Sequence, residues 1–339
     1  IRIGSIPNVL PVGKFSIGVT AGTEGDVCPE AWIESINKMQ LIIVPSNFTK
    51  QSFENTAKKH NLTITTTIKV IPEYFNEIIY NKNNTTSQIS GLHDIKESFC
   101  FLFVGHWLQG QLGEDRKNIT GMLHTFLETF KNKNNTPALI LKTSGATYSV
   151  VDKDQMEKNV RQIIKLYPKG TRLPNVYILH GDLTDNEMNS LYNNTKVKAM
   201  VSFTKGEGFG RPLLEFTTTG KPVIAPYYSG PADFLHPEYI AQLPGGLTPI
   251  HPSAQNDFLI GDAKWFTPDY KYASKLFKEI VKHYNKFLAK SRKHIKHSND
   301  NFSSQAISNV YQELFKYMDS EIGNVPVHQE IKLPTLRKV

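Results

Sequence analysis

The chain has 339 residues, of which 39% are hydrophobic, and this length suits two domains of roughly 150 residues each. The two cysteines, Cys28 and Cys100, are too few for a disulfide framework, so we expect buried free thiols and a cytoplasmic protein. We expect no signal peptide and no transmembrane segment, because no apolar run of about 18 residues is present. The formal net charge of +8 favours an anionic partner, such as a nucleotide, an acidic membrane face or a nucleic acid.

The first 80 residues alternate between strand and helix patterns, which predicts a parallel α/β domain. The predicted strands and the helices between them cover 15–21, 31–39, 41–46, 49–60 and 68–75. The loop after the first strand is small and acidic, and it carries Glu24 and Asp26. These two carboxylates are candidates for binding an acceptor or lining a cleft, with ordinary solvated loop carboxylates as the alternative.

A polar stretch over 81–90 predicts a loop or linker, so we place a first domain at 1–92, a second at 93–320 and a tail at 321–339. Repeated strand–helix order in the second domain predicts a doubly wound parallel sheet, with ligands at the carboxyl ends of its strands. Its predicted strands are 98–105, 138–145, 176–182, 199–203 and 222–226, and its predicted helices are 119–133, 152–167, 184–194, 213–219, 270–288 and 302–317. Residues 231–268 are rich in Pro, Gly and aromatics, which predicts a long irregular functional loop.

The stretch from Ala199 to Gly230 predicts a strand, a glycine loop, a helix and a second strand. Gly206, Gly208 and Gly210 follow the first strand and allow close approach of the backbone to a ligand. The free N–H groups and the dipole of a helix entered in this way favour a phosphate group. Two carboxylates frame the loop, Glu207 and Glu215, with seven residues between them.

This stretch resembles the donor-binding motif of retaining nucleotide-sugar glycosyltransferases, specifically glycosyltransferase family four, which has the two-domain GT-B fold. The motif is Glu-x7-Glu around EGFG-x-P-x-x-E, found here over 207–215, followed by GKPVIA at 220–225 and Ser229-Gly230. The first domain also resembles the later half of the family's acceptor-side domain, in Trp32–Met39, Ile42–Ser46 and Val70–Pro72. The resemblance implies two Rossmann-like domains facing a cleft, the first one incomplete or reduced.

The resemblance also implies roles for particular residues. Arg116 and Lys117 match the family's R-K-N element, whose cations hold the diphosphate leaving group, and charge developing on such a group requires cationic donors. Glu207 would contact hydroxyls of the donor sugar, and Glu215 would accept hydrogen bonds from ribose hydroxyls. Backbone N–H groups of Gly208, Phe209 and Gly210 would face the diphosphate or the sugar.

Three further residues are donor-binding candidates. Lys142 ends a predicted strand, with a solvated lysine as the alternative. His106 follows the glycine of another strand, with a histidine packed beside Trp107 as the alternative. Arg211 adds a phosphate contact or stacks on a neighbour.

No metal-ligand spacing is found among the histidines and cysteines, so we predict no metal and no cofactor, with a UDP or GDP sugar as the donor substrate. The two glutamates lie on one loop–helix element, which argues against a glycosidase-like pair. Retaining transfer in this family is viewed as a front-face reaction in which the leaving phosphate deprotonates the incoming hydroxyl.

The acceptor remains open at this point. A carbohydrate, lipid-linked or glycan acceptor is one hypothesis, with contact to an anionic membrane periphery. The basic cluster over 286–296 favours a nucleic-acid acceptor as an alternative, and thus a DNA-modifying sugar transferase. A third hypothesis is a non-catalytic module that binds a nucleotide sugar, motivated by the short first domain.

Overall fold

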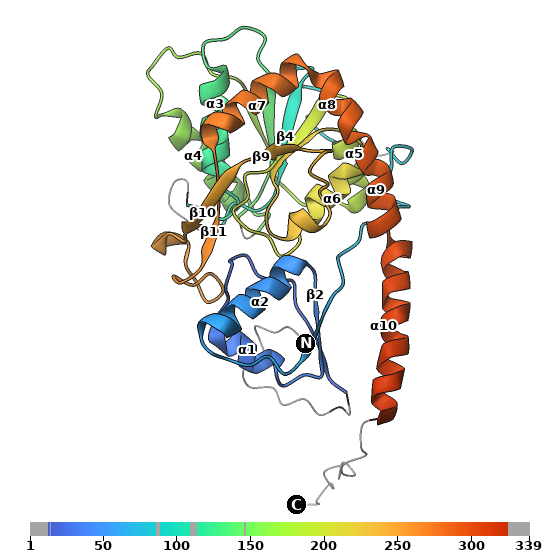
Figure 1. The fold of residues 1–339 in the computed structure, drawn as a ribbon. Helices are drawn as coiled ribbons and strands as arrows, with labels where there is room; N and C mark the ends of the chain where they lie inside the picture. Colours follow the sequence, from blue (N-terminus) through green and yellow to red (C-terminus); the bar gives the residue numbers. More distant parts are fainter. Residues whose placement is uncertain (1–12, 14, 86–88, 109–113, 146, 325–339) are drawn as a thin grey trace, which may run out of the picture.

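The computed structural model of the protein describes residues 13, 15–85, 89–108, 114–145 and 147–324. The described chain forms two α/β domains, stacked one above the other in Figure 1. The predicted tail falls mostly outside the described residues, and only its first residues, 321–324, belong to the last helix. None of the helices in the described part of the chain combines the length and hydropathy that a bilayer-spanning helix requires.

The first domain contains a three-stranded parallel sheet in the order β1-β2-β3. Its elements are β1 (Ile17–Val19), α1 (Glu30–Ile36), β2 (Leu41–Val44), α2 (Asn47–Lys59) and β3 (Thr67–Val70). The central strand β2 is buried along its whole length, as expected of a continuous apolar run in a parallel sheet. The Ser46 side chain accepts a hydrogen bond from the Thr49 backbone and so caps α2.

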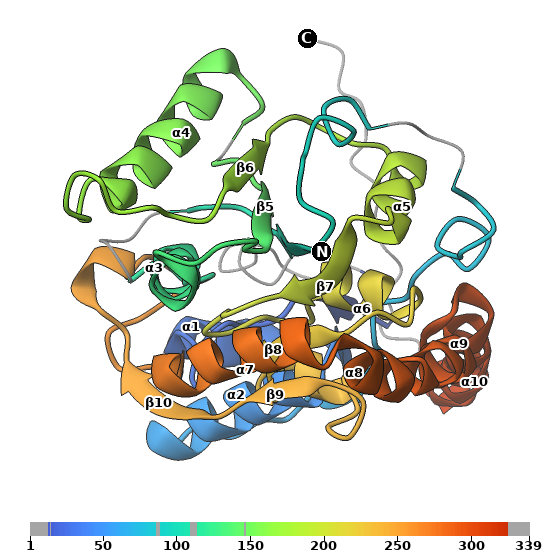
Figure 2. The same cartoon turned by 90° about the horizontal axis from the view of Figure 1, so that it is seen from above.

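The second domain contains a six-stranded parallel sheet in the order β6-β5-β4-β7-β8-β9. Its strands are β4 (Cys100–Val104), β5 (Ala138–Lys142), β6 (Val176–Leu179), β7 (Val197–Val201), β8 (Val223–Pro226) and β9 (Ala241–Leu243). The helices are α3 (Ile119–Phe130), α4 (Val150–Ile164), α5 (Asp185–Asn193), α6 (Arg211–Thr217), α7 (Tyr270–Lys282), α8 (Tyr284–Ser291), α9 (Lys293–Phe302) and α10 (Ser304–Asn324). Helices cover both faces of this sheet, as Figure 2 shows, so the predicted doubly wound parallel α/β fold is confirmed.

Three predictions of secondary structure were wrong. Residues 231–268 contain β9 and an antiparallel hairpin, β10 (Gly245–Pro249) and β11 (Lys264–Pro268), in place of a wholly irregular loop. The predicted helix over 270–288 is divided between α7 and α8 at His283, whose backbone (φ −121°, ψ 36°) leaves the helical region. The helix predicted over 302–317 begins at Ser304 and extends to Asn324, because α9 ends at Phe302 and Ser303 is extended.

The two domains exchange segments. Helix α10 belongs in sequence to the predicted second domain, but it runs beside the first domain in Figure 1 and packs Ile307 and Leu314 against Leu41 and Ile43 of β2. Conversely, the crossing segment after Ile71 contributes its buried side chains to the core of the second domain, with Phe75, Tyr80, Ile89 and Leu92. Neither domain therefore completes its core from one continuous stretch of chain.

The glycine loop after β7 lies against the first domain. A Cβ atom at Gly206 would collide with the carbonyl oxygen of Glu24, and one at Gly208 would collide with that of Ala21. Ser46 adds a hydrogen bond across the same contact, donating its hydroxyl to the Gly208 carbonyl at 2.6 Å. These two glycines are therefore required for the close approach of the two domains.

We expect Gly206→Ala to weaken this contact, because the added methyl group must displace the Glu24 backbone. Overpacking of this kind costs about 1–3 kcal/mol. Urea denaturation would measure the loss, with Gly246→Ala as the control, since a Cβ atom there meets nothing within 4 Å. Equal stability of the two variants would contradict the prediction.

Candidate active site

The order of the second sheet creates a crevice between β4 and β7. Chain connections leave β4 toward β5 on one side and return to β7 on the other, and ligands bind at such a point beyond the carboxyl ends of the strands. A cavity of about 380 Å³ lies there. It is lined by Tyr80, Val104, Gly105, His106, Arg116, Lys117, Lys142, Thr143, Ser144, Tyr148, Asp182, Leu183, Asp185, Met188, Tyr192, Arg211, Pro212 and Glu215. We call this space the strand-end cavity.

Arg116 and Lys117 reach the cavity from the loop before α3. Asp115 fixes the end of this loop, because its Oδ2 accepts a hydrogen bond from the Ile119 N–H at 3.0 Å. The Arg116 carbonyl accepts a hydrogen bond from the Lys205 N–H at 2.8 Å, which ties the loop to the chain after β7. These hydrogen bonds therefore hold the loop that carries both cations in a fixed position.

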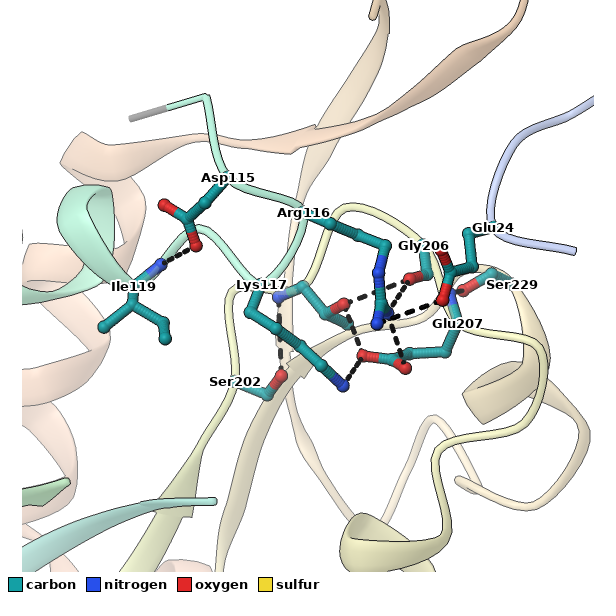
Figure 3. Close-up of polar contacts among 10 residues, drawn as sticks. Glu24, Asp115, Arg116, Lys117, Ile119, Ser202, Gly206, Glu207 and Ser229 are labelled. Atoms are coloured by element: carbon teal, nitrogen blue, oxygen red, sulfur yellow. Dashed lines mark hydrogen bonds and ion pairs between the residues drawn. The ribbon is translucent and has the colours of Figure 1, made fainter. Parts of the chain in front are cut away.

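The Glu207 carboxylate lies between these two cations (Figure 3). Its Oε2 is 2.9 Å from Arg116 Nη1, its Oε1 is 2.5 Å from Lys117 Nζ, and the Thr204 hydroxyl donates to Oε1 at 2.7 Å. Burial alone would raise the pKa of Glu207, but Lys117 and Arg116 hold it at about 2. The carboxylate is therefore ionised at neutral pH and orients both cations.

Arg116 also connects the two domains. Its Nη2 is 3.0 Å from Oε1 of Glu24 in the first domain, so the guanidinium contacts both Glu24 and Glu207, as Figure 3 shows. Its Nη1 also donates to the Gly206 carbonyl at 3.0 Å. Burial raises the pKa of Glu24, although Arg116 opposes this effect. The planar guanidinium thus joins the acidic loop of the first domain to the glycine loop of the second.

Glu215 extends into the same cavity from α6. The Tyr192 hydroxyl donates to its Oε2 at 3.1 Å, and Arg211 Nε lies 3.2 Å from its Oε1. Burial raises the pKa of Glu215 to about 7, and the contacts to Arg211 and Tyr192 lower it only in part. This carboxyl group lies in the cavity with Arg116 and Lys117 but is not paired with either of them.

The donor-binding candidates Lys142 and His106 also line the cavity. Lys142 Nζ donates to the Gly181 carbonyl at 2.6 Å and lies 5.4 Å from the centre of the Tyr148 ring. His106 Nδ1 is 2.9 Å from the Ser144 hydroxyl. Burial and the nearby Lys117, Lys142 and Arg116 lower the pKa of His106, so the imidazole is neutral at pH 7.

Other predicted site residues have different surroundings. Phe209 packs in the core 5.0 Å from the Phe234 ring, so its side chain is not available to a ligand. Gly208 is pressed against the first domain, and Gly210 is left-handed (φ +99°) as the cap of α6. The Asp26 carboxylate accepts a hydrogen bond from the Lys264 N–H at 2.6 Å, which joins the first domain to β11.

A second cavity of about 370 Å³ lies beside Arg116, which also lines the strand-end cavity. Its other described lining residues are Glu24, Trp107, Leu108, Gly145, Ala254, Asn256 and Leu259. Apolar side chains dominate its wall, together with the half-buried carboxylate of Glu24. The sequence interpretation anticipated only Glu24 in this group.

Sequence reasoning also missed several residues of the strand-end cavity. Thr143 and Ser144 directly follow β5, and Asp182 lies a short way beyond the end of β6. The rule that ligands bind beyond the carboxyl ends of parallel strands was therefore sufficient to find them. Tyr80 has no comparable signal, because it enters from the crossing segment. Among the described residues, no cluster of three or more His, Cys, Asp or Glu has the geometry to hold a metal ion.

Comparison with known proteins adds to this geometry. Residues 114–245 match the family model described as Glycosyl transferases group 1. No curated protein matches the sequence at a significant level.

Similar solved structures include sucrose-phosphate synthase from Thermosynechococcus elongatus, at 14% identity and a TM-score of 0.59, over 90% of this chain and 68% of that one. The α,α-trehalose 6-phosphate synthase of Burkholderia multivorans has 9% identity and a TM-score of 0.65, over 93% and 68%. HepE of Anabaena in complex with UDP and glucose has 14% identity and a TM-score of 0.55, over 85% and 66%. The chain thus spans about two thirds of the length of these proteins.

These likenesses show that the fold is GT-B, as predicted, with a smaller first sheet. The family match covers the loop of Arg116 and Lys117 together with Glu207 and Glu215. Fold and match together support a glycosyltransferase.

The raised pKa of Glu215 predicts a pH-dependent stability. The folded state favours the protonated carboxyl, so its contribution is fully present below the ordinary pKa of 4.5 and is lost as pH rises toward about 7. We expect Glu215→Gln to be more stable than the wild type at pH 8 by up to roughly 3 kcal/mol, and nearly equal at pH 4. Denaturant titrations at both pH values would measure this difference, and a pH-independent difference would contradict the prediction.

Proposed function

We propose that the protein is a retaining glycosyltransferase that moves a hexose from a nucleoside-diphosphate sugar to an acceptor hydroxyl without a metal ion. The proposal is carried by one observation, the convergence of Arg116, Lys117 and Lys142 on a single cavity at the strand ends. Its volume of about 380 Å³ lies within the range of small-molecule sites. Three preorganised cations that line one cavity favour a diphosphate, and more so as it leaves and gains charge.

The cations retain donors for such a ligand. Lys117 has three N–H donors and Glu207 accepts one of them, so the ammonium group has capacity for phosphate oxygens. Burial lowers the pKa of Lys117, and the ionised Glu207 opposes this effect by favouring the charged ammonium group. In this proposal Glu207 orients the two cations and, by the family resemblance, also contacts donor hydroxyls.

Glu215 is the proposed ligand of the ribose. Its carboxylate offers two acceptor oxygens to a vicinal diol, and it lies in the cavity with the proposed diphosphate cations. The solved structures of HepE contain UDP and UDP-glucose, which supports a uridine nucleotide as the donor here. A GDP sugar remains the alternative donor.

The second cavity is the proposed acceptor side. It shares Arg116 with the strand-end cavity, so an acceptor hydroxyl there would approach the donor beside the guanidinium. Glu24 would accept a hydrogen bond from it, and the ring of Trp107 would contact the apolar face of a sugar. A carbohydrate or glycan acceptor, free or lipid-linked, fits this wall.

The first test is thermal stability in the presence of UDP-, GDP- and ADP-sugars and free nucleotides, with and without EDTA. A ligand present at about 100 times its dissociation constant adds roughly 2.7 kcal/mol to the folded state. The proposal predicts stabilisation by one nucleotide class that EDTA does not remove. Proton NMR of the transfer product would then show whether the anomeric configuration is retained.

Three outcomes would contradict parts of this proposal. Donor binding without transfer or hydrolysis would indicate a non-catalytic binding module. Transfer that requires a divalent cation would exclude the metal-independent reaction. No stabilisation by any nucleotide would remove the donor-site assignment itself.

We expect Lys117→Gln to lower kcat/KM for transfer by about 10²–10³-fold, because it removes a charge that stabilises the leaving group. The control is Lys158→Gln on α4, an exposed lysine outside both cavities. Steady-state kinetics with the donor found above would measure both variants. Loss of activity in the two variants alike would show that the effect is not specific to the site.

A further inference from the structure

The positive charge of the protein is concentrated in one surface segment. Residues 270–302, which form α7, α8 and α9, contain nine Lys or Arg and two Asp or Glu. Their net charge of +7 compares with +8 for the whole chain, so the other 306 residues carry a net charge of only +1. The basic character of the protein is therefore a property of these three helices.

On α7 the lysines form a stripe on one face of the helix. They recur at intervals of four, three and four residues, and all are exposed: Lys271, Lys275, Lys278 and Lys282. The opposite face of α7 buries Ala273, Leu276, Phe277 and Ile280 in the core. The packing of this buried face therefore fixes the direction in which the lysines point. Because residues three or four apart on a helix are neighbours, the four lysines lie next to one another.

The charge continues beyond α7. Exposed basic residues follow on α8 and α9: Lys286, Lys290, Arg292, Lys293 and Lys296. Figure 2 shows the three helices following one another along an edge of the second domain. The 13 residues of α7 alone extend over roughly 20 Å at 1.5 Å per residue.

Very little of this charge is neutralised within the protein. Among the nine basic side chains, Lys296 alone has an ion-pair partner in the described part of the chain, Asp300. The other acidic residue of the segment, Glu279, lies 3.8 Å from His283. Closely spaced lysines repel one another, so an external anionic surface would relieve a repulsion that the fold itself leaves in place.

We propose that the exposed face of α7, α8 and α9 binds an anionic lipid surface. Four to eight basic residues on the polar face of an amphipathic helix are typical of attraction to acidic lipid headgroups. The segment offers no extended row of exposed aromatic side chains for a single-stranded nucleic acid. Phe277, Tyr284 and Phe287 pack against the core, and the two exposed rings, Tyr270 and Tyr272, both lie at the start of α7. In Figure 1, α7 and α8 lie at the end of the second domain far from the first, so a membrane there would not cover the crevice.

This proposal is independent of the donor site. It is tested by sedimentation of the full chain with vesicles of phosphatidylcholine alone, or of phosphatidylcholine mixed with phosphatidylglycerol, at rising NaCl. Binding is expected only to the mixed vesicles and is expected to weaken as salt screens the charges. Each lysine that reaches the surface contributes roughly fivefold to the partition coefficient.

The test variant carries four substitutions on α7: Lys271→Gln, Lys275→Gln, Lys278→Gln and Lys282→Gln. The matched control removes the same number of exposed lysines from α4 and the loop after it: Lys153→Gln, Lys158→Gln, Lys165→Gln and Lys169→Gln. We expect the α7 variant to lose well over tenfold in vesicle binding and the control to lose little. A smaller variant, Lys286→Gln with Lys290→Gln, tests the α8 part with less change to the fold.

Three results would overturn the proposal. The first is a wild type that fails to bind the mixed vesicles. The second is an α4 control that loses as much binding as the α7 variant, which would indicate an effect of total charge. The third result is binding to duplex DNA but not to vesicles, with loss in the α7 variant, which would assign the stripe to a nucleic acid.

Discussion

The arrangement of the site depends on the buried contact of one carboxylate with two cations. Glu207 accepts from Arg116 and Lys117, and each of these three groups is almost enclosed by protein. Such a buried cluster costs desolvation energy, and removing one partner leaves an uncompensated charge, at a typical cost of about 3–5 kcal/mol. The cluster is therefore poor evidence of added stability. Its effect is to hold two cations at the strand ends in fixed directions.

The same cluster links the two domains. Arg116 contacts Glu24 of the first domain and Glu207 of the second, so the guanidinium position depends on how closely the domains approach. That approach depends in turn on Gly206, where any side chain would collide with the Glu24 backbone. Separation of the domains would therefore break the Arg116–Glu24 contact. Domain position and site electrostatics are coupled through one side chain.

The sequence predicted the alternation of strands and helices, because strand and helix periodicity is local. The expectation that ligands bind at the carboxyl ends of parallel strands then favoured Arg116, Lys117 and Lys142 as site residues. The sequence did not predict what the glycines do. Gly206 and Gly208 were interpreted as making space for a ligand, but their space is filled by the backbone of the first domain. A glycine in the sequence indicates that another group comes close to the backbone, but it does not identify that group. The group is identified only by the tertiary structure.

The exchange of segments between the two domains was also not predicted from the sequence. The apolar spacing of α10 indicates a buried face. No local sequence pattern indicates that Ile307 packs in one cluster with Ile43, some 260 residues earlier in the chain. Tyr80 reaches the strand-end cavity for the same reason, because the crossing segment packs on the second domain. Long-range packing of this kind is set by the complementarity of whole surfaces, so periodicity alone cannot supply it.

Net charge proved to be a poor guide to the site and a good guide to the surface. The cations near the proposed diphosphate position are balanced by Glu24 and Glu207, so the site adds little to the total of +8. The lysines of α7 have no such partners among the described residues, and they account for much of that total. Positive charge in this protein thus has two separate arrangements. One is buried, paired and fixed in direction, which suits a small ligand, and the other is exposed and unpaired, which suits an extended anionic surface.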